Sequence, residues 1–95
     1  MKLWVDDIRP APSGYDFWSY SVNNAKAIIK LNDIQLIDID HDAGDYAYDG
    51  GDYIKLLDWL EETGRNIPIR IHSMNPVGVQ NMRMIINKNG WREIR

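Results

Sequence analysis

Hydrophobic residues along the chain fall into short continuous runs that alternate with stretches at helical spacing. Each β-branched or aromatic run predicts a strand, and each stretch with apolar residues at i, i+3, i+4 and i+7 predicts a helix. The predicted order is β, β, α, β, α, β, α, β, and helical crossovers favour parallel pairing of the later strands in an α/β fold. The expected strands cover residues 2–5, 16–20, 34–39, 67–72 and 91–94, and the expected helices cover 22–30, the segment from the Gly50-Gly51 pair to Gly64, and 76–88.

Polar residues follow the strands at the points where the strands end. Asp6 and Asp7 follow the first strand, residues 40–42 follow the third, and Ser73 and Asn75 follow the fourth. In open parallel sheets, ligands bind beyond the carboxyl ends of the strands. These polar residues are therefore expected to lie near one another at one edge of the sheet.

The acidic residues are concentrated in one part of the chain. Eleven of the fourteen are aspartate, and six of these fall within fifteen residues: Asp38, Asp40, Asp42, Asp45, Asp49 and Asp52. The spacing of the first three matches positions 1, 3 and 5 of an EF-hand loop, but Ala43 stands where that loop requires glycine and a strand precedes it. The EF-hand is the weaker interpretation.

Composition limits the classes of function. A chain of 95 residues with 44% hydrophobic residues predicts one folded domain over residues 1–95. A net charge of −3 without a basic cluster argues against duplex DNA as a partner. The absence of cysteine excludes disulfides and thiolate metal sites. No apolar run has the length of a signal peptide core or a membrane span, so a cytoplasmic protein without a membrane partner is expected.

Three segments carry a resemblance to a known family. "LWVDD", "LIDIDHD" and "IRIHS" resemble the strand ends of a two-component receiver domain. "LWVDDIRPAP", "DHDAG" and "HSMNPVG" more closely resemble the cyclic-phosphate processing receiver domain. The resemblance implies a flavodoxin-like fold, with a five-stranded parallel sheet in the order 2-1-3-4-5.

The resemblance also implies a site. Asp6, Asp7 and Asp40 would hold a divalent cation, Mg²⁺ or Mn²⁺, with Asp42 offering its backbone carbonyl or its side chain. Asp40 would also correspond to the phosphoacceptor, and Ser73 would contact a phosphoryl oxygen. Independently, converging carboxylates repel one another unless they are protonated or bridged, and Mg²⁺ favours oxygen ligands.

Four further residues are candidates from their positions. His41 adjoins the carboxylates and is a candidate general acid or base, because nearby negative charge favours its protonated form. Asn75 precedes a predicted helix and could bind phosphate together with the helix amides, or simply cap the helix. Tyr46 and Tyr48 could stack on a base or sugar, although local packing is the simpler interpretation.

One departure from receiver domains separates the possible functions. Receivers carry a lysine at the end of the fifth strand, whereas this chain offers Arg92 and Arg95 there, and Lys88 precedes the strand. The leading hypothesis is metal-dependent processing of a phosphate-containing small molecule or nucleotide end. The alternatives are a non-catalytic interaction module and a phosphoacceptor for a histidine kinase, and the missing lysine disfavours the last.

One face of the sheet is expected to lack helices. The first receiver helix is replaced by a proline-rich segment at residues 9–14, and the last is missing after the fifth strand. In the fourth strand, isoleucines alternate with Pro68, Arg70 and His72, which indicates one polar face. Trp4 and Asp38 are expected on that face, covered by residues 8–20 or by a second copy in a homodimer, with an Asp38–Arg70 ion pair and a structural hydrogen bond from His72.

Overall fold

Five parallel strands form one sheet in the computed structural model, which describes residues 1–95. The strand order is β2-β1-β3-β4-β5, and all four neighbouring pairs are parallel. This confirms the flavodoxin-like order 2-1-3-4-5 expected from the sequence. The strands are β1 (Lys2–Val5), β2 (Phe17–Ser19), β3 (Leu36–Ile39), β4 (Ile69–Ile71) and β5 (Glu93–Ile94), slightly shorter than their apolar runs.

Three α-helices connect the strands, and their ends follow local capping chemistry. The α1 helix (Val22–Leu31) begins after Ser21, whose hydroxyl accepts a hydrogen bond from the amide of Asn24 at 3.1 Å. The α2 helix spans Ile54–Glu62, and the α3 helix (Pro76–Asn89) has proline in its first turn and a left-handed Gly90 at its end. A short 3₁₀ helix, η1 (Gly44–Tyr46), was not predicted.

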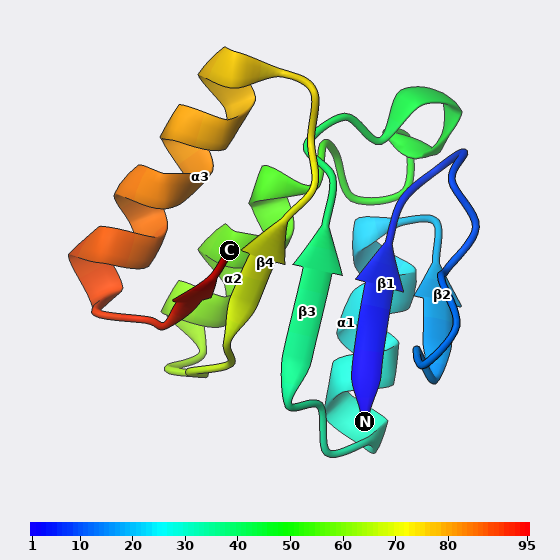
Figure 1. Cartoon of the computed structure of the whole chain (residues 1–95), viewed down its shortest axis with the longest axis horizontal. Helices are drawn as coiled ribbons and strands as arrows, with labels where there is room; N and C mark the ends of the chain where they lie inside the picture. Colours follow the sequence, from blue (N-terminus) through cyan, green and yellow to red (C-terminus); the bar gives the residue numbers. More distant parts are fainter.

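All three helices pack on one face of the sheet. In Figure 1, α1 and α2 lie behind the strands, and α3 flanks α2 beyond β4. Alternate strand residues point toward these helices and are fully buried: Leu3, Val5, Ile37, Ile39 and Ile69. They belong to a single core cluster of 17 buried residues. The predicted two-layer arrangement, with helices on one face of the sheet and none between β1 and β2, is therefore confirmed.

The chain covers its own open face. The segment between β1 and β2 passes in front of the edge strand β2 (Figure 1), and its Arg9 carbonyl accepts a hydrogen bond from the indole of Trp4 at 2.8 Å. Tyr15, from the same segment, packs edge-on against Trp4 and donates its hydroxyl proton to Asp38. Trp4 and Asp38 are consequently only 7% and 1% exposed, so their burial needs no second copy.

The predicted Asp38–Arg70 ion pair on this face is present, although Arg70 is not the nearest partner of Asp38. Arg70 lies 3.8 Å from Oδ2 of Asp38, and its side chain is half exposed. The closer contacts of Asp38 are with Tyr15 and His72. No helix in the fold has the length and apolar character needed to cross a membrane.

Candidate metal and phosphate site

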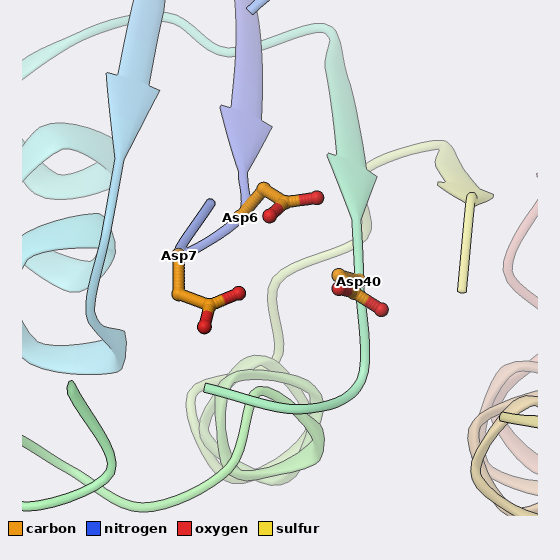
Figure 2. Close-up of side chains that lie close together, drawn as sticks. All are labelled: Asp6, Asp7 and Asp40. Atoms are coloured by element: carbon orange, nitrogen blue, oxygen red, sulfur yellow. The ribbon is translucent and has the colours of Figure 1, made fainter. Parts of the chain in front are cut away.

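Three carboxylates meet at the carboxyl edge of the sheet. One oxygen from each of Asp6, Asp7 and Asp40 lies within 4.8 Å of the other two. Figure 2 shows Asp6 and Asp7 where β1 ends and Asp40 where β3 ends. These strands are neighbours, with Val5 paired to Ile39, and the amide of Asp40 donates to the carbonyl of Val5 at 3.0 Å. Parallel pairing alone brings the three side chains together.

Asp6 is a buried carboxylate with hydrogen-bond donors on both oxygens. Its Oδ1 accepts from the backbone amides of Ile8 and Arg9, each at 2.9 Å, and its Oδ2 lies 2.8 Å from Nε2 of His72. Burial alone would raise the pKa of Asp6, but these hydrogen bonds hold that pKa below its ordinary value. Asp6 is thus anionic and rigidly oriented.

Asp7 is in the opposite electrostatic situation. Burial raises the pKa of its carboxyl, and the neighbouring negative charges of Asp6 and Asp40 raise that pKa further. A divalent cation among the three oxygens would remove this repulsion, and carboxylate oxygens are ligands that Mg²⁺ and Mn²⁺ prefer. The donor set and the spacing therefore fit such an ion.

Gly44 makes room for Asp7. A β-carbon built on Gly44 would overlap Oδ2 of Asp7, and the glycine also adopts a positive φ of 54°. The backbone of η1 at Gly44 therefore lies in close contact with the Asp7 carboxylate. Only glycine satisfies both the conformation and the close approach.

His72 links the cluster to the open face. Its Nε2 faces Asp6, and its Nδ1 lies 2.6 Å from Oδ1 of the buried Asp38. A ring with a proton on each nitrogen donates to both carboxylates, whereas a neutral ring would leave one of them facing a lone pair. The sequence predicted a structural hydrogen bond for His72 but gave no signal of its contact with Asp6, which is 66 positions away.

His41 and Asp42 form a separate pair beside the cluster. Nδ1 of His41 lies 2.7 Å from Oδ1 of Asp42, and the side-chain amide of Asn75 donates to the same oxygen at 3.4 Å. The Asp42 side chain is largely exposed and is not among the three that converge. Its backbone carbonyl, the other ligand considered from the sequence, stays a prediction.

Ser73 and Asn75 lie at the start of α3. The Asn75 side-chain oxygen accepts from the amide of Gly78 at 3.0 Å, and the Ser73 hydroxyl oxygen accepts from the amide of Asn75 at 3.1 Å. Both oxygens therefore serve helix capping. The Ser73 hydroxyl proton is left to donate to a ligand, as is the Asn75 amide proton that does not face Asp42.

The acids at positions 38, 40 and 42 do not converge. Asp38 lies on the open face with His72, Asp40 belongs to the carboxylate cluster, and Asp42 pairs with His41. An EF-hand loop requires all three to face one ion. The structure therefore argues against that alternative.

Comparison with known families agrees with this arrangement. The family model of the cyclic-phosphate processing receiver domain matches residues 1–88. The chain belongs to this family. No curated protein and no solved structure matches this chain.

The residue that directly follows β5 is Arg95 and not lysine. Arg95 follows the strand, is 72% exposed in its side chain, and lies 3.3 Å from Glu93. Glu93 also pairs with Arg83 of α3 at 2.8 Å. Arg83 and Arg95 therefore both pair with Glu93, and no lysine or arginine forms an ion pair with the carboxylate cluster.

Proposed function

We propose that this receiver domain holds a divalent cation, Mg²⁺ or Mn²⁺, at Asp6, Asp7 and Asp40 and uses the site to process a phosphate ester. The substrate class that we propose is the cyclic phosphate of a nucleotide or an RNA end, in line with the name of the family. The observation that carries the proposal is the approach of three carboxylate oxygens to within 4.8 Å of one another.

Phosphate needs positive charge or hydrogen-bond donors, and the cluster has no lysine or arginine partner. A bound cation would supply that charge and would stabilise the negative charge that develops on phosphoryl oxygens. Ser73 and the side-chain amide of Asn75 would donate to the same oxygens, beside the amino end of the 14-residue α3.

His41 is suited to moving the proton. No hydrogen bond within the chain involves its Nε2, while Nδ1 faces Asp42 and is held by it. In hydrolysis of a cyclic phosphate, a water oxygen bonds to phosphorus, one ring P–O bond breaks, and the released sugar oxygen gains a proton. Nε2 of His41 would take the proton from water and return it to the leaving oxygen.

Asp40 offers a second route through covalent catalysis. Its carboxylate would bond to phosphorus as one ring P–O bond breaks, the released sugar oxygen would take a proton from water, and a second water would later hydrolyse the acyl phosphate. One Asp40 oxygen already accepts from the amide of His41 at 2.7 Å, which fixes the carboxylate orientation. Labelled protein after acid quench of a phosphorus-labelled substrate would distinguish this route from direct attack by water.

The test is turnover of nucleoside 2′,3′-cyclic phosphates with Mg²⁺. We expect turnover that chelation abolishes and that Asp40→Asn reduces at least a hundredfold, by analogy with the loss of one group that stabilises charge in a transition state. Asp45→Asn is the matched control, because Asp45 is an exposed acid of the adjacent η1 that does not belong to the cluster.

A second candidate is a non-catalytic receiver-like interaction module. Arg95 stands where receivers carry a lysine, and it pairs with Glu93 together with Arg83. This pairing favours an interaction module over a phosphoacceptor for a histidine kinase. Metal binding without turnover across a broad panel of phosphate esters would support this module. Self-association of the chain in sedimentation would then identify a second copy as its partner.

A further inference from the structure

Four aromatic side chains form a continuous ladder beside the carboxylate cluster. Trp18 and Tyr20 come from β2 and the residue after it, and Tyr46 and Tyr48 come from η1 and the turn that follows. Successive ring centroids are 4.7, 5.2 and 6.5 Å apart, and the last two pairs are stacked, with interplanar angles of 24° and 28°. Two segments distant in sequence therefore present one run of rings.

The ladder is attached to the residues that form the cluster. The indole nitrogen of Trp18 donates to the backbone carbonyl of Asp6 at 2.9 Å. Tyr46 ends the same η1 turn whose Gly44 lies against the Asp7 carboxylate. The base of the ladder is thus fixed next to the carboxylates by both segments.

Local packing does not account for the exposure of the ladder. Tyr48 is 84% exposed and Tyr20 is 39% exposed. By contrast, cationic side chains lie over the ring of Trp59: Lys26, Lys30 and Arg65. No cationic side chain lies over any ring of the ladder.

We propose that the ladder of Trp18, Tyr20, Tyr46 and Tyr48 binds the base of a nucleoside phosphate whose phosphate lies at the carboxylate cluster. This inference rests on the proposed function and specifies its substrate. In a nucleoside phosphate, one sugar separates the planar base from the phosphate. This short separation matches a ladder that begins directly beside the carboxylate cluster. Stacking on aromatic side chains tolerates any base, so little discrimination among bases is expected.

The experiment compares two ligands that differ only in the base. Adenosine 2′,3′-cyclic phosphate and the methyl riboside 2′,3′-cyclic phosphate are titrated into the full chain with Mg²⁺, and tyrosine ring shifts are followed by NMR. Phosphorus NMR in the same sample measures any hydrolysis of each ligand, and the affinities are taken from spectra recorded while the ligand is still intact. We expect the adenosine ligand to bind about tenfold more tightly, a typical gain from stacking one base.

Variants of the exposed ring provide the control. Tyr48→Leu removes the ring and is expected to bring the affinity for the adenosine ligand toward that for the riboside, leaving the riboside affinity unchanged. Tyr48→Phe keeps the ring and is expected to retain the preference. Because Tyr48 is 84% exposed, neither change is expected to affect folding.

The outcomes separate this inference from the proposed function. If the two ligands bind equally and Tyr48→Leu changes neither affinity, the ladder does not bind the base. That result would overturn this inference and leave the proposed metal and phosphate site intact. Binding of neither ligand would overturn the proposed function and the ladder with it. An oligonucleotide with a terminal 2′,3′-cyclic phosphate distinguishes the source of the base: tighter binding than the mononucleotide supports an RNA end on the ladder, and equal binding supports a free nucleotide.

Discussion

His72 lies flat on Trp4, with ring centroids 3.9 Å apart and planes 4° apart. The stack holds the imidazole in the plane that lets one nitrogen reach Asp6 and the other reach Asp38. A residue of the open face therefore orients a carboxylate of the candidate metal site.

Removing His72 is expected to destabilise the fold. His72→Ala would leave Asp6 and Asp38, both 1% exposed, without the group between them. Leaving a buried polar group without its hydrogen-bond partner typically costs about 1–3 kcal/mol in unfolding free energy. Urea denaturation measures this, and Tyr48→Leu, at a highly exposed ring, is the control. A loss no greater than that of the control would show that the His72 contacts contribute little.

The sheet order and the site edge were predictable because they depend on local patterns. Alternation of apolar and polar residues around Arg70 gave the open face, and acids directly after two neighbouring strands gave the cluster. The sequence left open whether the path of the β1–β2 segment or a second copy covers the open face, because the deciding contacts, Trp4 with Arg9 and Tyr15 with Asp38, leave no local pattern. The aromatic ladder depends on that same path and on η1, which is too short to leave a periodic pattern.

The direction of Asp42 was the least predictable part of the site. Sequence spacing placed it with Asp40 and did not indicate which way its side chain turns. In the structure, His41 and Asn75 supply nearer partners. Such competition among neighbouring polar groups is decided by tertiary geometry and not by spacing.

Gly44→Ala is expected to affect cation binding as well as stability. Its β-carbon would displace the Asp7 carboxylate, and the positive φ adds strain. We expect Mg²⁺ affinity to fall about tenfold, as for other changes that misplace a ligand. Gly64→Ala is the matched control, since Gly64 has a φ of 67° and nothing within 4 Å of its built β-carbon. Equal Mg²⁺ affinity in the two variants would contradict the contact with Asp7.

Gly78→Ala tests the contact between α3 and His41. Alanine in place of a helical glycine ordinarily stabilises by about 1 kcal/mol. Here a β-carbon would overlap the His41 ring, so we expect a lower melting temperature and reduced turnover of cyclic phosphate. Asn81→Ala, at an exposed position of the same helix, gives the propensity gain without that contact. Stabilisation of both variants alike would show that His41 moves freely.

The raised pKa of Tyr15 predicts that the protein loses stability at alkaline pH. Burial raises the pKa of Tyr15 to about 12, and the hydrogen bond to Asp38 and the charge of Asp38 contribute. A pKa raised by folding gives stability that is fully present below the ordinary tyrosine pKa of about 10 and is lost as pH rises through the folded value. Tyr15→Phe should therefore be about 1 kcal/mol less stable than wild type at pH 8, with the difference shrinking toward pH 12. Urea denaturation across this range measures it, and a constant difference would rule out the linkage.

The most direct test of the central claim is calorimetric titration of Mg²⁺ or Mn²⁺ into the wild type, Asp7→Asn, Asp40→Asn and Asp45→Asn. If Asp6, Asp7 and Asp40 hold one cation, wild type and Asp45→Asn bind one ion with equal affinity. The two cluster variants lose at least about tenfold in affinity, the smallest loss typical even of changing a group that only orients a metal ligand. Equal titration curves for all four proteins, or no binding by the wild type, would contradict the claim.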